Sequence, residues 1–384
     1  MEKDVVIIGG GASGLFCAIN LPKHINATII DPMALGKKFL VTGNGRCNLT
    51  NLDCSNAYNK DTSGFFDRFN QFDTINAFKN LGLLTYADSE GRVYPTSNSA
   101  VSVQTVLTQK IETLKNISYM RDCVTSVCAN NGKYIITTTN GEKVTSKYVV
   151  LACGGNAKID LPKDIFITPF TPALCGLVTA KNNGLNGVRV QDVVVSLYNK
   201  DKEIYKERGE ILFKDNGISG IVVMNISNHI KDFDNTTLKI DLLPNYTKSE
   251  LVRFIQETIQ KNDLLVSQIL NGILNLALAS SILSSCGVQF NANAKTLKDE
   301  KIISVVDKIK GYTLKVLGMS NNNQIFFGGV LLGDLSENLE HNAHANLYVT
   351  GEFTEVIGHC GGHNLQWAFT SGSIVGRAIS EKTK

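Results

Sequence analysis

A strand, a tight turn, a helix and a second strand follow one another within the first 31 residues, and this succession constrains the fold most. Residues 5–8 form a continuous apolar run, as expected of a parallel strand buried on both faces. Residues 12–21 have the pattern of a short helix, and residues 27–30 form another apolar strand that ends at Asp31. The succession predicts an α/β protein with a Rossmann-type domain at its N-terminus.

The turn between this strand and helix carries glycines at three fixed positions, Gly9, Gly11 and Gly14. In a GxGxxG turn the first glycine permits the tight bend, the second lets the backbone approach a pyrophosphate, and the third allows close helix packing. Asp31 follows Gly11 by 20 residues, where an acidic side chain binds a ribose diol and repels a 2′-phosphate. The pattern predicts a dinucleotide site, but it does not distinguish FAD from NAD.

The rest of the chain contains segments with an alternating α/β pattern, one segment rich in β-strands and one helical segment. Residues 101–115 and 364–380 are predicted helices, and strands are predicted at 117–128, 134–139, 144–152, 325–332 and 347–350. Turn dipeptides at Asn131-Gly132 and Asn140-Gly141 predict hairpins. Between these parts, residues 166–245 are rich in short β-type segments and residues 248–285 are helical. We therefore expect a split nucleotide-binding domain with a β module and a helical module inserted.

Composition and charge exclude several classes of protein. Hydrophobic residues make up 43% of the chain and charged residues 19%, which excludes a mostly disordered protein. The net charge of +3, from 38 basic and 35 acidic residues, disfavours nucleic acid as a partner. The N-terminus shows no signal-peptide pattern, and no apolar run is long enough to cross a membrane. Nine cysteines without a CxxC pair predict a reducing, cytoplasmic location and no metal site.

Several longer motifs resemble one family of proteins. The segment 36–51, which contains Gly43-Asn44-Gly45-Arg46-Cys47-Asn48, is similar to the signature of the HI0933-like (YhiN/BaiN-type) family of FAD-dependent flavoproteins. Further similar motifs lie at 171–174, 209–213, 217–220, 351–352 and 361–368. The resemblance therefore covers essentially the whole chain.

The resemblance implies non-covalent FAD in a split Rossmann-type domain, with an inserted β-barrel module and a small helical module. The expected FAD domain comprises residues 1–165 and 322–384. The expected barrel-like domain comprises residues 166–245 and 311–321, and the helical domain comprises residues 246–310.

Physical arguments and the resemblance together assign the cofactor site. Residues 42–47 offer consecutive N–H groups to anionic oxygens, and Arg46 either contacts phosphate or pins this loop. The N-terminus of the last helix is expected to face the flavin, and the backbone at Val124 the adenine. The residues expected to bind FAD are Gly9, Gly11, Ala12, Ser13, Gly14, Asp31, Lys38, Thr42, Gly43, Asn44, Gly45, Arg46, Cys47, Asn48, Val124, Gly154, Gly351, Glu352, Gly362, Asn364 and Gln366.

This chain departs from the family's pattern at some positions. Ile221 stands where a proline is usual, and Ile357 replaces an acidic residue. His359, Cys360 and His363 stand where Tyr, Thr and Tyr are common. We expect His359 or His363 to serve as the catalytic proton donor, the alternative being that both only form hydrogen bonds around the flavin.

Only one dinucleotide fingerprint is visible, so NAD(P)H is left open as a transient electron donor. The leading hypothesis is an FAD-dependent oxidoreductase that transfers hydride between flavin and a small organic substrate. NAD(P)H-dependent reduction of a conjugated C=C bond competes with oxidation of an aminoacetone-type amine by dioxygen.

An RNA-modifying or RNA-binding flavoprotein is the alternative of another class. A disulfide-reductase role for Cys47 is disfavoured against packing inside the FAD loop. The oligomeric state stays open.

Overall fold

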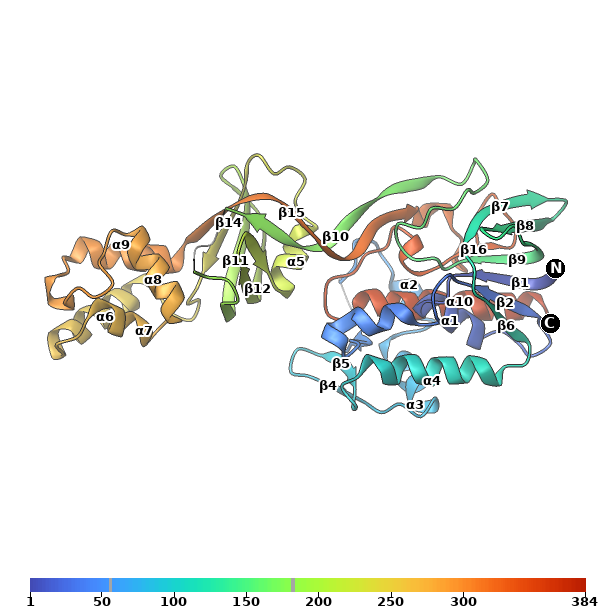
Figure 1. Ribbon diagram of the computed structural model, residues 1–384, viewed down its shortest axis with the longest axis horizontal. Helices are drawn as coiled ribbons and strands as arrows, with labels where there is room; N and C mark the ends of the chain where they lie inside the picture. The colour runs from blue at the N-terminus through green and yellow to red at the C-terminus, as the bar shows by residue number, and fades with distance from the viewer. Residues whose placement is uncertain (55–56, 181–183) are drawn as a thin grey trace. The chain divides into compact units, whose positions relative to one another are not determined.

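The computed structural model describes residues 1–54, 57–180 and 184–384, and the chain divides into two compact units (Figure 1). The first unit comprises Met1–Pro172 and Ile325–Lys384, and the inserted unit comprises Ala173–Gln324. The barrel strands and the helices of the inserted unit form one compact unit, so their division into two domains stays a prediction.

The first unit is built around a mixed sheet of strand order β6-β2-β1-β9-β8-β7, in which β16 also pairs with β9. Strands β1, β2, β6, β9 and β16 pair in parallel, and β7, β8 and β9 pair antiparallel. Their bounds are β1 (Glu2–Ile8), β2 (Ala27–Ile30), β6 (Ile117–Met120), β7 (Val124–Asn130), β8 (Lys133–Thr138), β9 (Lys143–Leu151) and β16 (Leu347–Val349). The predicted strand–turn–helix–strand unit is confirmed.

The two predicted hairpins are also confirmed, since Asn131, Gly132 and Gly141 all adopt positive φ. The prediction of one strand over residues 117–128 was wrong. The chain forms β6 and β7 as separate strands because β6 pairs in parallel with β2, whereas β7 runs antiparallel to β8. The segment predicted as one strand therefore supplies two strands with different neighbours.

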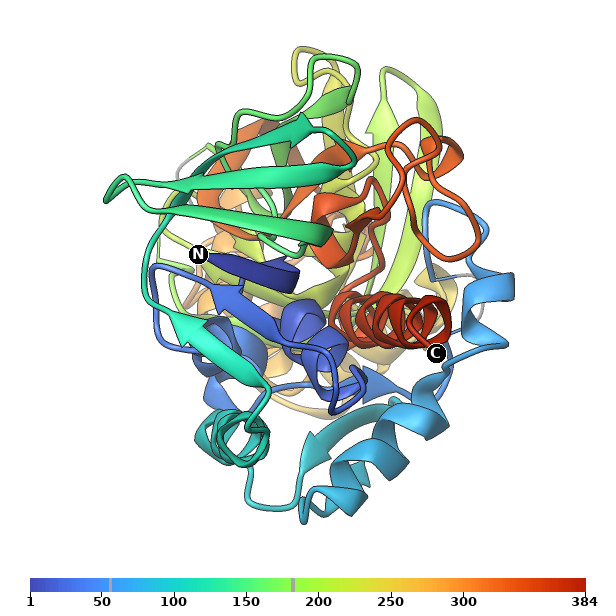
Figure 2. The ribbon, with the colours of Figure 1, turned by 90° about the vertical axis from the view of Figure 1, so that its right-hand side faces the viewer.

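Two helices from opposite ends of the chain pack against each other in the first unit. These are α1 (Ala12–Ile19) and α10 (His363–Lys382), the red helix of Figure 2. A Cβ atom at Gly372 would lie 2.2 Å from the Ser13 carbonyl oxygen, and one at Gly376 would lie 2.6 Å from that of Cys17. The glycines of α10 therefore permit a backbone approach that no larger residue allows.

Smaller elements complete the first unit. A 3-10 segment, η1 (Lys37–Gly45), follows β2, and β3 (Thr50–Asn51), β5 (Arg92–Pro95) and β4 (Thr85–Ala87) form a small antiparallel sheet. The remaining helices are α2 (Ser63–Phe66), α3 (Gln71–Asn80) and α4 (Ala100–Thr113), and further 3-10 turns are η3 (Leu332–Asp334) and η4 (Gly351–Phe353).

The inserted unit contains a closed barrel of order β10-β13-β12-β11-β14-β15, and several helices. The strands are β10 (Ile167–Thr179), β11 (Arg189–Asn199), β12 (Lys202–Lys214), β13 (Gly217–Ser219), β14 (Thr236–Asp241) and β15 (Tyr312–Val330). The helices are α5 (Ile221–Ser227), α6 (Lys248–Lys261), α7 (Val266–Asn271), α8 (Leu276–Ser285), η2 (Ala294–Thr296) and α9 (Asp299–Lys310). Ile221 is thus the first residue of a helix, a position that also accepts proline.

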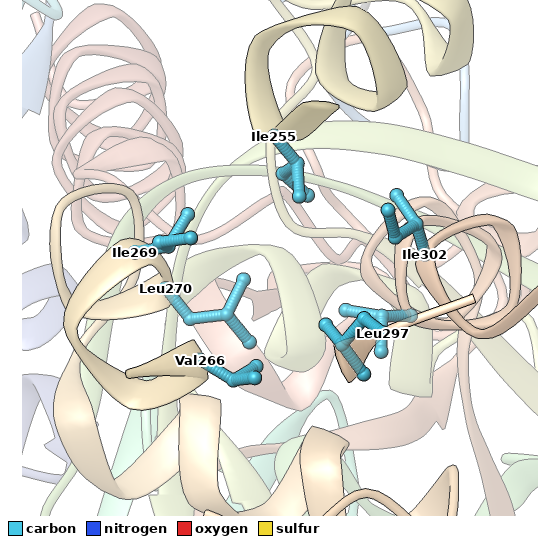
Figure 3. Close-up of a pocket in the computed structure, with 7 residues that line it drawn as sticks. Ile255, Val266, Ile269, Leu270, Leu297 and Ile302 are labelled. Atoms are coloured by element: carbon cyan, nitrogen blue, oxygen red, sulfur yellow. The ribbon is translucent and has the colours of Figure 1, made fainter. Parts of the chain in front are cut away.

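A small cavity lies among the helices of the inserted unit (Figure 3). Its lining is entirely aliphatic and consists of Ile255, Val266, Ile269, Leu270, Leu297, Ile302 and Val305. No polar group of this lining could orient a ligand, so the cavity is a packing feature. Across the described ranges, no helix combines the length and the apolar character that crossing a membrane requires.

Candidate functional site

The glycine-rich turn after β1 is both tightly packed and open on one side. Gly9 has a φ of +112°, and a Cβ atom there would lie 2.3 Å from the Ala152 carbonyl oxygen. A Cβ atom at Gly14 would lie 2.0 Å from the Gly9 carbonyl oxygen, whereas at Gly11 it would meet nothing within 4 Å. The turn is therefore compressed against the sheet and helix, and its Gly11 side leaves space for a pyrophosphate.

Asp31 lies at the end of β2 and is fixed by two backbone donors. The Gly10 N–H donates to Oδ2 at 2.7 Å, and the Met33 N–H donates to Oδ1 at 2.7 Å. The carboxylate therefore joins the glycine-rich turn to the end of β2. Its remaining lone pairs stay available to a ribose diol.

The segment 42–48 has the unusual backbone that its glycines and asparagines predict. Gly43, Asn44 and Gly45 have φ values of 54°, 54° and 83°. A Cβ atom at Gly45 would meet nothing within 4 Å, so space remains beside this turn too. Asn48 is buried, and in the described ranges its Oδ1 lacks a hydrogen-bond partner. Such an orphaned oxygen is costly unless a ligand donates to it.

Arg46 and Cys47 follow in the same segment. The Arg46 guanidinium lies 4.4 Å from the centre of the Tyr94 ring, and its Nε donates to the Gly43 carbonyl at 3.4 Å. These contacts favour the loop-pinning role, and phosphate binding by Arg46 stays a prediction. Cys47 is fully buried, and burial raises the pKa of its thiol to about 12. All nine cysteines fall within the described ranges and are free of disulfides.

Lys38, Gly154 and Glu352 come together although they are far apart in the sequence. Lys38 Nζ lies 3.5 Å from Glu352 Oε2, and the Phe326 N–H donates to Glu352 Oε1 at 2.8 Å. A Cβ atom at Gly154 would lie 2.8 Å from Lys38 Nζ, and one at Gly155 would lie 2.5 Å from Glu352 Oε1. Both glycines therefore make room for this charged pair.

The two candidate histidines lie on the same turn but in different environments. Their ring centres are 6.4 Å apart. His363 is buried, its Nε2 lies 3.1 Å from the Asp53 carbonyl oxygen, and the Tyr58 hydroxyl donates to the His363 carbonyl at 2.8 Å. Burial lowers the pKa of the His363 imidazole below its ordinary value. His359 is only partly buried.

The other predicted residues near α10 face the protein rather than an open space. The Asn364 side chain bonds to the backbone of Gly358 and His359. Gln366 is fully buried and donates to Thr370 Oγ1 at 3.0 Å, while its Oε1 lacks a partner in the described chain. A Cβ atom at Gly362 would lie 2.4 Å from the Thr50 carbonyl oxygen.

The remaining predicted residues also have defined places. Gly351 begins a 3-10 turn and its N–H donates to Ser371 Oγ at 2.9 Å. Val124 is the buried first residue of β7. Ala12 begins α1, and Ser13 is buried against α10. Thr42 donates through its hydroxyl to the Phe39 carbonyl at 2.7 Å.

Sequence reasoning missed several residues around this site. Asn51 Nδ2 donates to the Gly361 carbonyl at 3.2 Å, and Asn59 bonds to the loop before α10. Tyr58 contacts the first residue of that helix. Asn51 is the last residue of the 36–51 motif, so the motif could have indicated its role. Residues 57–60 carry no sequence pattern that indicates a role.

These observations satisfy what a bound dinucleotide requires. Space lies beside Gly11 and Gly45, a fixed carboxylate stands at Asp31, and a long helix begins at His363 without a side-chain cap. The residues present therefore fit FAD. The fold and this turn define a Rossmann-type dinucleotide-binding protein.

The family model described as the HI0933-like protein Rossmann domain matches residues 3–378, and the chain belongs to this family. A 3-dehydro-bile acid delta(4,6)-reductase from Clostridium scindens is 31% identical over 406 aligned residues, covering 98% of each chain. A ribosomal RNA dihydrouridine synthase from Haemophilus influenzae is 26% identical, again covering 98% of each chain. With this membership, the protein is an FAD-dependent oxidoreductase.

Among solved structures, a thioredoxin reductase from Lactococcus lactis aligns with 42% of this chain and 38% of its own length. The identity is 16% and the TM-score is 0.24.

Proposed function

We propose that the protein is an FAD-dependent reductase of a carbon–carbon double bond conjugated to a carbonyl group, with NAD(P)H as the electron donor. The observation that carries this proposal is that the names of two relatives describe the same kind of reaction. A delta(4,6)-reductase of a 3-dehydro-bile acid and a dihydrouridine synthase each add two hydrogens across such a bond. Both relatives align with 98% of this chain.

The chain's own residues divide the task of holding the cofactor. The Gly9–Gly14 turn and Asp31 would hold the adenosine half and the pyrophosphate, and residues 42–48 the middle of the molecule. The N-terminus of α10 would hold the flavin end, where its partial positive charge favours an anion. Bound FAD supplies two-electron transfer as hydride at this end.

Saturating the double bond requires a proton as well as a hydride. We assign the proton to His359, which is partly exposed, rather than to His363, whose Nε2 is held by a backbone carbonyl. Because that carbonyl oxygen can only accept, Nε2 of His363 carries the hydrogen, and the other ring nitrogen, Nδ1, is buried without a hydrogen-bond partner in the described chain and so has no route for proton exchange with solvent. His363 therefore acts in positioning, and the catalytic role expected for one of the two histidines falls to His359.

Anaerobic reduction of the purified yellow protein tests this function. FAD should be released intact by acid or heat. NADH or NADPH should bleach the flavin, and a steroid-type enone should then restore its absorption. His359→Phe should slow only the second step, by about 10²–10⁴-fold if it is the general acid. Peroxide formation with an amine, and no reaction with an enone, would favour the amine oxidase instead.

A relative's name also favours a second candidate, in which the double bond is that of a uridine in RNA. The inserted unit has 18 basic and 15 acidic residues, and the first unit has 20 of each, so the net charge of +3 resides in the inserted unit. RNA binding that weakens steeply between low and moderate salt, together with dihydrouridine formation, would favour this substrate. Salt-independent binding of an enone would favour the small molecule.

Nine cysteines without a CxxC pair accord with a reducing compartment, and we propose that the protein works in the cytoplasm.

A further inference from the structure

The first part of the loop that leads into α10, residues 355–359 of 355–362, is paired with a distant segment of the chain. The His359 N–H donates to the Ala57 carbonyl at 2.9 Å, and the Asn59 N–H donates to the Ile357 carbonyl at 3.0 Å. The two segments are about 300 residues apart in the sequence. This pairing, an isolated antiparallel bridge between Tyr58 and Gly358, gives the loop before α10 a partner segment on one side.

The Asn59 side chain extends the pairing by two further bonds. Its Nδ2 donates to the Glu355 carbonyl at 3.0 Å, and its Oδ1 accepts from the Ile357 N–H at 2.8 Å. A single amide side chain therefore satisfies both a donor and an acceptor of the loop backbone. Alanine could replace neither bond.

A second asparagine bonds to the same loop from within α10. Asn364 Oδ1 accepts from the Gly358 N–H at 2.8 Å, and its Nδ2 donates to the carbonyls of Gly358 at 2.9 Å and His359 at 3.3 Å. The loop backbone from 355 to 359 is thus held between Asn59 on one side and Asn364 on the other.

Neighbouring contacts hold the same region from outside. Lys60 Nζ lies 2.9 Å from Glu355 Oε2, and Glu355 Oε1 accepts from the Leu332 N–H at 2.9 Å. The Tyr58 ring packs so closely on the loop that a Cβ atom at Gly358 would lie 2.8 Å from it. The loop can shift only if these contacts break.

These contacts fix the position of the loop and therefore the start of α10. The helix begins at His363 after Gly362, which has a φ of +103° and gives no side-chain cap. Helices leave their first N–H groups without partners inside the helix, and the direction of these groups follows the loop that precedes them. His359, to which we assign the proton, lies on that loop.

We propose that Asn59 is a positioning residue for the reaction, because it fixes the loop that sets both the first N–H groups of α10 and His359. This inference rests on the proposed function. Asn59 acts through the backbone of residues 355–357. A shift of about 1 Å in the position of a catalytic group, caused by a change away from the reacting atoms, is enough to lower the reaction rate by about 10²-fold.

Asn59→Ala tests the proposal, with Asn116→Ala as the matched control. The Asn116 side chain likewise makes two bonds to the backbone, in its case to the carbonyls of Pro22 and Ile25, just before β6, an edge strand of the sheet. We expect Asn59→Ala to retain FAD and to exchange the amide hydrogens of residues 355–362 about tenfold faster or more. Its flavin midpoint potential should fall and its oxidation by an enone should slow at least tenfold. The control should show none of these changes.

Asn59→Asp covers the case in which the alanine variant does not fold. It keeps the acceptor for the Ile357 N–H and loses the donor to the Glu355 carbonyl, so a smaller change in the same direction is expected. The positioning role would be overturned if the amide hydrogens of the loop exchange faster while the flavin midpoint potential and the rate of flavin oxidation by an enone stay unchanged. That result would leave FAD binding and the proposed function in place. Wild-type protein that cannot bind FAD would overturn the proposed function and this role with it.

Discussion

Replacing Asp31 by asparagine tests the link between the glycine-rich turn and β2. The carboxylate accepts two backbone N–H groups, from Gly10 and Met33, each at 2.7 Å. An amide of the same shape has one acceptor oxygen, so one of the two donors loses its partner and faces an NH₂ group instead. Asp31→Asn therefore disturbs the turn without removing volume.

The size of the effect follows from these two bonds. A hydrogen bond to a charged group contributes about 1.5–3 kcal/mol when buried. Asp31 is only partly buried, so we expect the loss to lie near 1–2 kcal/mol, about a 5–30-fold weaker affinity for FAD. Affinity for flavin mononucleotide should fall less, because that molecule lacks the adenosine half.

Titration of the apoprotein with FAD, followed by quenching of flavin fluorescence, measures the change. Asp4→Asn is the matched control, since Asp4 Oδ2 accepts from the Asn26 N–H at 2.8 Å near the start of β1, away from the turn. If Asp31→Asn binds FAD as tightly as wild type, or loses equal affinity for both flavins, the carboxylate does not organise the adenosine site.

Three further predictions follow from packing and burial. Gly372→Ala should destabilise the protein by about 1–3 kcal/mol or more in thermal unfolding, because its Cβ would meet a backbone oxygen of α1 at 2.2 Å; Gly64→Ala, a helical glycine with open space, should not. Burial lowers the pKa of His363, so the unfolded chain binds more protons and stability should fall as pH drops below about 6.5. His363→Phe should flatten that slope between pH 5 and 7, and an unchanged slope would exclude His363 as its source. Cys47, whose pKa is raised to about 12 by burial, should resist alkylation at pH 8 in the folded state while exposed Cys123 reacts, and equal rates would contradict the packing role.

The sequence could predict those parts of the fold that depend on neighbouring residues. The β1–α1–β2 unit and the two asparagine–glycine hairpins follow from local apolar patterns and from glycine's tolerance of positive φ. The break between β6 and β7 could not be predicted, because it depends on which strand each segment pairs with.

The same distinction separates the predicted and missed parts of the site. Gly9, Gly11 and Asp31 form a spaced motif, so their proximity could be expected from the sequence alone. The pairing of Asn59 with Ile357 joins segments that no spacing connects, and it decides how the loop before α10 is held. The burial of His363 likewise depends on its contact with Asp53 and could not be read from the residues around it.

The packing of α10 on α1 has a consequence for the order in which this protein matures on the ribosome. β16 and α10 belong to the last 40 residues of this sequence, yet they complete the sheet and cover the helix that starts at Ala12. The inserted unit, residues 173–324, leaves the exit tunnel earlier and has its own hydrophobic core. The nascent inserted unit can therefore fold while β9 and α1 still lack their C-terminal partners, β16 and α10, and the cofactor site is completed only once α10 has been translated.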